Sequence, residues 1–276
     1  MTSEDSATTA ERGPAVRAML NGAVGVVELN RPPHNFADAD MMRELANMLT
    51  DLGSQDSCRA IVVAAEGRSF CAGANFSSAP SAQAVESGKT MADIFRLGAR
   101  GIYAEAERIF AVPRPMIAAV HGAAVGAGLG LALACDLRVT CPEARFLANF
   151  ARLGIHPGFA LSLTLPRLLG PGRAADLMLT GRVVYGDEAF KLGLVDRVVP
   201  QAEVRQTALA LAAEIAAAAP LAVQATRATL RRGLVDEVRA TLAIELEEQA
   251  QLMGTVDALE GISAMIARRE PQFKGR

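Results

Sequence analysis

The segment 120–136 constrains the fold of this chain more than any other. It places three glycines within five residues, Gly126, Gly128 and Gly130, and continues in leucine and alanine. Such a turn lets the backbone approach a neighbouring group closely, and the small residues that follow predict a tightly packed helix. The start of that helix can offer N–H groups and the positive end of the helix dipole to a ligand oxygen, or it can serve close packing alone.

Short apolar strands and helical segments alternate over residues 24–200, which predicts an α/β architecture with crossover connections. A hairpin is expected over 16–29, turning at Asn21-Gly22, and Asp38 is expected to cap a helix over 40–52. Further strands are expected at 60–65, 116–120, 137–140, 145–147 and 195–199, with a loop over 66–81, a helix over 84–111 and another from the glycine turn to about Ala134. After residue 200 only helices are expected, at about 201–218, 220–231, 234–252 and 255–268.

The chain divides by composition into a polar tail (1–13) that is expected to be disordered, an α/β core (14–200) and a helical region (201–276). The tail has no apolar core of the kind that a signal peptide needs. The most apolar run, 208–223, is interrupted by Glu214 and Pro220 and is too short to span a bilayer. The expectation is a cytoplasmic protein without a membrane segment.

Charge and composition exclude some classes of function. The net charge is −2, aromatic residues make up 4% and tryptophan is absent, which argues against a nucleic-acid surface. None of the four cysteines lies in a Cys-x-x-Cys pair and there are only three histidines, so no zinc site is expected. The cysteines are interpreted as free thiols of a reducing compartment.

Two predicted buried strands are each followed by a loop, and the two loops are similar in composition. The first spans 67–76 and the second 121–130, and both are rich in Gly and Ala. Because both strands belong to one predicted sheet, the loops can converge on one ligand oxygen. Two backbone N–H donors on a carbonyl form an oxyanion hole.

The sequence of these loops resembles the crotonase superfamily, the enoyl-CoA hydratases and isomerases. Phe-Cys-Ala-Gly-Ala-Asn-Phe at 70–76 resembles the family's first loop, and 116–136 resembles its second motif, which ends in Cys-Asp. The resemblance extends in the right order from residue 15 to residue 274. Its other parts are Leu-Asn-Arg-Pro at 29–32, Gly-Ile-His-Pro-Gly at 154–158, the Thr-Gly to Val-Val segment at 180–199, and Glu-Pro-Gln-Phe-Lys at 270–274.

The resemblance implies a ββα superhelix core with a C-terminal helical trimerisation region, assembled as a homotrimer or a dimer of trimers. It implies an acyl-CoA thioester as ligand, with coenzyme A as part of the substrate, no separate cofactor and no metal. The oxyanion donors carry over to the N–H groups of Ala74 and Ala127. The implied substrate and CoA contacts are His34, Ala72, Asn75, Phe76, Gly126, Phe273 and Lys274, the last two from the same subunit or from a neighbouring one.

The acidic side chains that the resemblance leads us to look for are missing. The family's hydratases use two glutamates as acid and base, and the matching positions hold Gly130 and Phe150. A third position, where relatives carry Asp, is Phe159. Because each acid–base group contributes roughly 10²–10⁴ to a rate, weak hydratase activity is expected unless other groups substitute.

His156 and Asn149 are the candidate catalytic substitutes. His156 lies in the Pro-Gly turn, where it either transfers a proton or bonds to the backbone. Asn149 adjoins the vacated second position, as a pocket donor or as a strand-end residue. His121 and Asp136 are interpreted as structural, and no His adjoins Cys71 in sequence to make it a thiolate.

Three readings of the function are open. In the first, the chain is an acyl-CoA enzyme that keeps the oxyanion hole and performs isomerisation, decarboxylation or thioester hydrolysis. In the second, it is a true enoyl-CoA hydratase with unusual catalytic residues. In the third, it is an inactive paralogue that only binds CoA thioesters. A nucleotide-dependent dehydrogenase is excluded, because the glycine turn is not Gly-x-Gly-x-x-Gly and no acidic residue follows at the required distance.

Overall fold

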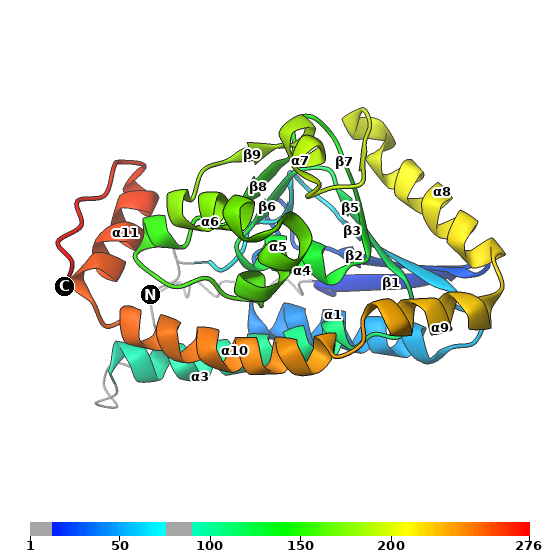
Figure 1. The fold of residues 1–276 in the computed structure, drawn as a ribbon, viewed down its shortest axis with the longest axis horizontal. Helices are drawn as coiled ribbons and strands as arrows, with labels where there is room; N and C mark the ends of the chain where they lie inside the picture. Colours follow the sequence, from blue (N-terminus) through cyan, green and yellow to red (C-terminus); the bar gives the residue numbers. More distant parts are fainter. Residues whose placement is uncertain (1–12, 76–89) are drawn as a thin grey trace, which may run out of the picture.

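The computed structural model describes residues 13–75 and 90–276. Within these residues, six strands form the larger sheet in the order β1-β2-β3-β5-β7-β10, and four strands form a second sheet in the order β4-β6-β8-β9 (Figure 1). The larger sheet consists of β1 (Val16–Asn21), β2 (Val24–Leu29), β3 (Ala60–Ala65), β5 (Met116–Val120), β7 (Leu137–Thr140) and β10 (Arg197–Val198). The expected α/β core followed by helices is confirmed.

The larger sheet begins with the expected hairpin. β1 and β2 are antiparallel, with Asn21 opposite Val24, and the remaining neighbours pair in parallel. β2, β3 and β5 are buried along their whole length, as expected of parallel strands with both faces covered.

The second sheet was only partly expected. It consists of β4 (Ser69–Cys71), β6 (Ala123–Val125), β8 (Arg145–Leu147) and β9 (Val184–Tyr185). The prediction of one continuous loop over 66–81 is wrong at β4, and the glycine turn contains β6 before its helix begins. β8 lies where a strand was expected, at 145–147, whereas β4, β6 and β9 were not expected, because two or three residues rarely show an alternation of polar and apolar residues.

The expected helices are present where the structure describes them, whereas the helices at Leu161–Leu169 and Pro171–Thr180 were not expected. Asp38 caps α1 by accepting from the N–H of Met41, and all four C-terminal helices are present. The expected helix at 84–111 is described only from Thr90, which caps α3; residues 84–89 lie outside the described residues. The helices are α1 (Ala39–Ser54), α3 (Met91–Phe110), α4 (Ala127–Ala134), α5 (Leu161–Leu169), α6 (Pro171–Thr180), α7 (Gly186–Leu192), α8 (Val204–Ala217), α9 (Pro220–Leu230), α10 (Leu234–Leu252) and α11 (Val256–Ala267), with 3-10 turns at Ala151–Leu153 and Gln201–Glu203.

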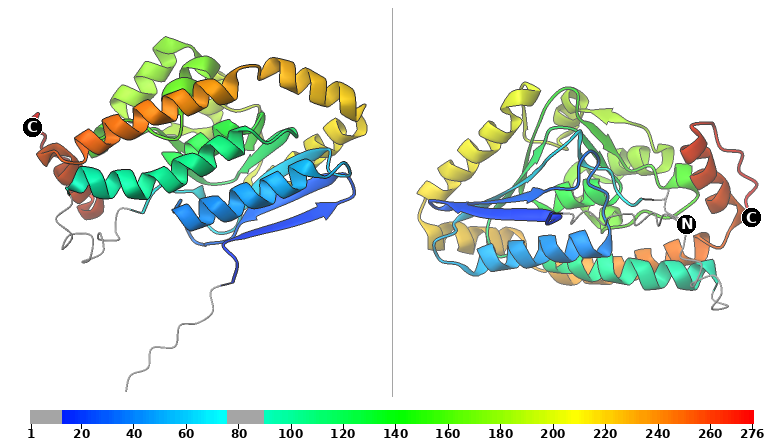
Figure 2. Two further views of the ribbon diagram at one scale, coloured as in Figure 1. Left: turned by 90° about the horizontal axis from the view of Figure 1, so that it is seen from below. Right: turned by 180° about the vertical axis from the view of Figure 1, so that it is seen from behind.

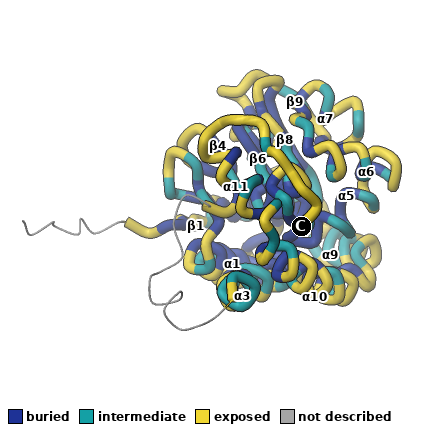
Figure 3. The backbone as a smooth tube through the Cα atoms, turned by 90° about the vertical axis from the view of Figure 1, so that its left-hand side faces the viewer, coloured by how far each residue is buried: buried dark blue, intermediate teal, exposed yellow. Residues whose placement is uncertain are grey.

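The helices cover the sheets from different sides. α3 and α10 run side by side, with α1 against α3 (Figures 1 and 2). α8 lies across β3, β5 and β7 of the larger sheet, so the helical region covers the α/β core rather than standing apart from it. After α11 the chain ends in an exposed tail (Figure 3).

Within the described residues no single helix has the length and apolar character to cross a bilayer. The sharply bent pair Gln201–Ala217 and Pro220–Leu230 passes that test jointly, on length and composition alone.

Candidate active site

The first candidate loop is held by the segment that follows β2. The amide of Asn35 is fully buried and donates to the carbonyls of Glu66 (2.7 Å) and Ser69 (2.9 Å). The N–H of Ala72 donates to the carbonyl of His34 (3.0 Å). Two of the predicted CoA contacts, His34 and Ala72, are therefore brought together by the backbone.

The second candidate loop ends where α4 begins. Gly126 adopts φ +53° and ψ −116°, a conformation open to glycine but strained for other residues. Its N–H donates to the carbonyl of Leu147 (3.0 Å), and its carbonyl accepts the N–H of Gly130 (3.0 Å). The N–H of Ala127 therefore lies in the first turn of α4, where helix N–H groups have no partner within the helix.

The two loops touch through their glycines. A Cβ atom on Gly73 would lie 2.7 Å from the carbonyl oxygen of Val125 and 3.8 Å from the nitrogen of Ala127. A Cβ on Gly128 would lie 2.0 Å from the carbonyl oxygen of Cys71. Glycine is needed at both positions, because any side chain would drive the loops apart.

Ala74 follows Gly73, so its N–H belongs to the same close approach as the N–H of Ala127. Ala74 is exposed and Ala127 is half-buried. Within residues 13–75 and 90–276, neither N–H donates a hydrogen bond. Among these residues, both N–H groups are therefore without an intramolecular acceptor.

Aromatic rings lie at or beside Gly130 and Phe150, the two positions that the resemblance matches to catalytic acids. A Cβ on Gly130 would lie 2.6 Å from the Cδ1 atom of Phe159, whose side chain is fully buried. A Cβ on Gly126 would lie 3.4 Å from the Cζ atom of Phe150. The side chains that pack beside the second loop are therefore apolar, and the ring of Phe159 occupies the space next to Gly130.

Phe159 belongs to a strained turn that a buried carboxylate holds in place. Phe159 and Ala160 have φ values of +60° and +57°, which are uncommon for residues with a side chain. Glu245 of α10 is fully buried and accepts from the N–H of Ala160 (2.7 Å), the N–H of Ser162 (3.0 Å) and the hydroxyl of Ser162 (2.6 Å). Burial raises the pKa of the Glu245 carboxyl, although these three donors oppose the rise.

His156 lies in the same cluster. Its Nδ1 atom is 2.8 Å from the carbonyl oxygen of Pro157, and its own carbonyl accepts from the side-chain amide of Gln249 (2.7 Å). The hydroxyl of Tyr103, on α3, donates to the same Gln249 amide. Burial, and then the charge of Glu245, raise the pKa of the Tyr103 hydroxyl.

Sequence reasoning missed Tyr103, Glu245 and Gln249. On their own helices these residues have the spacing of ordinary inward-facing positions. Their partners lie 83 to 146 residues away in the chain, so no local pattern identifies them.

The other candidate residues lie in varied places. Asn149 is half-buried, just before the 3-10 turn at Ala151–Leu153, and Asn75 is exposed at the end of the first described range. Phe76 lies outside the described residues. Phe273 and Lys274 lie in the C-terminal tail, where the N–H of Lys274 donates to Asp257 (2.7 Å).

Several residues interpreted as structural have structural partners. The Nε2 atom of His121 is 3.0 Å from the carbonyl oxygen of Gly67, and Asp136 pairs with Arg227 and Arg231. Burial raises the pKa of the Cys71 thiol to about 11, so it is protonated at neutral pH. In the described part of the chain, His, Cys, Asp and Glu do not gather in threes as a metal site requires.

Comparison with known proteins gives consistent matches along the chain. A family model described as enoyl-CoA hydratase/isomerase matches residues 19–276. A probable enoyl-CoA hydratase of Bacillus subtilis is 35% identical over 262 residues, covering 95% of this chain and 99% of the relative. A short-chain-enoyl-CoA hydratase of Clostridium acetobutylicum is 32% identical, covering 92% of this chain and 96% of the relative. The crystal structure of an enoyl-CoA hydratase/isomerase from Pseudoalteromonas atlantica superposes with a TM-score of 0.81 at 29% identity, covering 95% of this chain and all of that one.

Proposed function

This chain belongs to the enoyl-CoA hydratase/isomerase family, a family of enzymes, and we propose that it binds an acyl-CoA thioester with the carbonyl oxygen on the N–H groups of Ala74 and Ala127. The resemblance seen in the sequence, to the crotonase superfamily and its α/β fold, is confirmed at this level. The substrate class is supported by the names of the relatives, which are hydratases of enoyl-CoA.

The close approach of the two glycine loops carries the proposal. With Gly73 packed against Val125, the N–H groups that follow each glycine lie on adjacent backbone segments. Donors fixed in this way need no rearrangement when negative charge develops on an oxygen, and each contributes roughly 10²–10³ to a rate. The position of Ala127 at the start of α4 adds the positive end of a helix dipole.

The apolar wall of Phe150 and Phe159 bears on the reaction. Hydration needs a water molecule held by proton-transfer groups, and these rings supply none. We therefore propose a reaction that depends mainly on stabilising the thioester enolate or oxyanion, such as isomerisation, decarboxylation or thioester hydrolysis. His156 and Asn149 are the side chains we propose for proton transfer or donation in it.

A true hydratase is the second candidate, because the named relatives are hydratases. In that case the cluster of His156, Gln249 and Tyr103 would have to replace the missing acids. An inactive paralogue that binds acyl-CoA without turnover is the third. A homotrimer or a dimer of trimers in the cytoplasm is part of the same proposal.

The first test separates these candidates by product. The purified protein is incubated with crotonyl-CoA, with a longer 2-enoyl-CoA and with a 2-carboxyacyl-CoA, and the thioesters are separated by liquid chromatography, which resolves isomers of equal mass, before mass spectrometry. A gain of one water far above background would favour the hydratase. Conversion without water addition, or release of free CoA, would favour enolate or hydrolytic chemistry. Binding without change of any thioester would favour the inactive paralogue.

The second test addresses the oxyanion hole. Gly126→Ala puts a side chain on a backbone with φ +53° and ψ −116°, which should displace the Ala127 N–H and lower turnover by roughly 10²–10³. Gly172→Ala is the matched control, because a Cβ there meets nothing within 4 Å. Equal turnover in the two variants would contradict a role for this donor.

A further inference from the structure

The polar cluster around the Pro-Gly turn is almost fully bonded to itself. Both oxygens of Glu245 accept from backbone N–H groups or from the hydroxyl of Ser162, whose proton is used in that bond. The hydroxyl of Tyr103 donates to Oε1 of Gln249, and Nε2 of Gln249 donates to the carbonyl of His156 (2.7 Å). Each of these side chains is therefore engaged in holding the cluster together.

The imidazole of His156 is the exception. Its Nδ1 atom lies 2.8 Å from the carbonyl oxygen of Pro157. Because a carbonyl can only accept, we assign the proton of the neutral ring to Nδ1. Nε2 then has a lone pair, and within residues 13–75 and 90–276 no group donates to it. A half-buried imidazole in this state is a proton acceptor.

The turn that carries His156 is fixed against the first turn of α4. Before His156 in the chain, the ring of Phe150 lies against Gly126, and after it Phe159 packs against Gly130. The chain from 150 to 159 therefore begins and ends at the helix turn that offers the second backbone donor of the proposed oxyanion hole.

Tyr103 and Gln249 hold this turn in position. A Cβ atom on Gly158 would clash with the hydroxyl of Tyr103 and would lie 2.8 Å from Nε2 of Gln249, so the pair packs directly on the backbone beside His156. The charges of His156 and Glu245 interact. A proton gained at Nε2 therefore places positive charge near a buried carboxylate, which is favourable.

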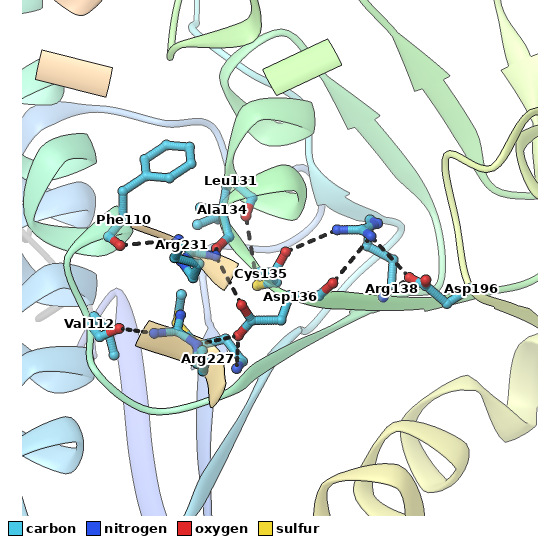
Figure 4. A network of polar contacts seen from close by, with 11 residues as sticks. Phe110, Val112, Leu131, Ala134, Cys135, Asp136, Arg138, Asp196, Arg227 and Arg231 are labelled. Atoms are coloured by element: carbon cyan, nitrogen blue, oxygen red, sulfur yellow. Dashed lines mark hydrogen bonds and ion pairs between the residues drawn. The ribbon is translucent and has the colours of Figure 1, made fainter. Parts of the chain in front are cut away.

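The far end of α4 is fixed as well (Figure 4). Asp136 follows the helix, with Oδ2 at 2.7 Å from Nε of Arg227 and Oδ1 at 3.0 Å from Nη1 of Arg231. Arg231 also donates to the carbonyl of Ala134, the last residue of α4 (3.2 Å). Contacts at both of its ends therefore keep α4 in place relative to the turn that carries His156.

We propose that Nε2 of His156 accepts the α-proton of the bound acyl group, and that Tyr103 and Gln249 are its positioning residues. The inference rests on the proposed function, because the oxyanion hole holds the thioester. The Cα–H bond breaks, its proton passes to Nε2, and its electron pair forms an enolate whose oxygen lies on the two backbone donors. Reversal returns a proton to the same carbon, so a saturated acyl-CoA should exchange its α-protons with solvent.

The test follows butyryl-CoA in deuterium oxide by proton NMR, with the full-length protein. We expect the wild type to exchange the α-protons far faster than the protein-free control, and His156→Gln to lower the rate at least about 100-fold. Tyr103→Phe removes only the bond to Gln249 and should lower the rate about tenfold, while the Kd of butyryl-CoA changes less than about twofold. Tyr185→Phe is the matched control, because Tyr185 is exposed on β9, and it should exchange at the wild-type rate.

Nitrogen-15 spectra test the ring assignment without turnover. The chain has three histidines, so the signals of His156 in histidine-labelled protein are those that His156→Gln removes. We expect a protonated Nδ1 and a bare Nε2 at pH 8.

The outcomes separate this inference from the proposed function. Exchange that Gly126→Ala lowers and His156→Gln does not would overturn the inference and leave the oxyanion hole in place. Binding of butyryl-CoA without exchange, a bare Nδ1 with a protonated Nε2, or equal rates in Tyr103→Phe and Tyr185→Phe would overturn it too. Exchange that His156→Gln lowers and Gly126→Ala does not would contradict the oxyanion hole alone, and absence of butyryl-CoA binding would overturn both.

Discussion

Replacing Glu245 with glutamine should destabilise the protein by more than its conservative chemistry suggests. If the amide oxygen takes the place of Oε1, it keeps the two bonds from Ser162. The amide nitrogen then faces the N–H of Ala160, which in the wild type donates to Oε2 at 2.7 Å. One buried donor loses its acceptor, which costs about 1–3 kcal/mol, and a second donor is placed against it. The neutral amide is easier to bury than a carboxylate, so we expect a net loss of about 2–3 kcal/mol.

The assay is urea unfolding at pH 7, with Glu248→Gln as the control. Glu248 is exposed on the same helix, so its replacement should change the free energy of unfolding by less than about 0.5 kcal/mol. If the two variants unfold at the same urea concentration with equal slopes, Glu245 does not hold the Phe159–Ala160 turn and the reasoning is refuted.

The same residue should give a pH dependence. Burial raises the pKa of Glu245 in the folded protein above its ordinary value of 4.5. A raised folded-state pKa means that its contribution to stability is fully present below pH 4.5 and declines as pH rises through the folded-state pKa. Unfolding curves of the wild type should show this decline relative to Glu245→Gln; parallel pH profiles would contradict it.

Three further predictions concern other buried contacts. Gly130→Ala should destabilise the protein by about 1–3 kcal/mol through overpacking against Phe159, despite the better helix propensity of alanine; stabilisation in urea unfolding would contradict the contact. Cys71 and Cys135, whose pKa values burial raises to about 11 and about 12, should resist iodoacetamide at pH 8 until the protein is unfolded, and fast labelling of the native protein would show that they are accessible. Asn35→Ala should lower the free energy of unfolding by about 2–4 kcal/mol by removing an acceptor and two donor bonds; a loss below about 0.5 kcal/mol would mean that the first loop is held by other contacts.

The sequence predicted the larger elements well because their signals are local. The Asn21-Gly22 turn, the Asp38 cap and the apolar runs of β3 and β5 are each readable within a few residues. β4, β6 and β9 have two or three residues each, and they exist because neighbouring strands pair with them. Such strands rarely have a signal of their own; β8 and β10, which the sequence did indicate, are the exceptions.

The candidate site was predictable where it is made of backbone. Glycines spaced around Gly73 and Gly126 mark places where chains approach closely, and the structure brings these loops together. The contact between Gly130 and Phe159 joins two positions that lie 29 residues apart, and no local pattern in the sequence pairs them. Glu245 acts on a turn 83 residues before it, so its role follows from the packing of α10 and not from its neighbours in sequence.

Building the carbonyl-binding loops from main-chain atoms has an evolutionary consequence. Every amino acid except proline carries an N–H group, so substitutions at Ala74 or Ala127 can leave the donors in place, provided that the neighbouring glycines are kept. Under the proposed function, a lineage can lose its acidic side chains and still hold the thioester. Later mutations can then change the reaction, while the conserved glycines keep the backbone donors, and with them the thioester, in the same position.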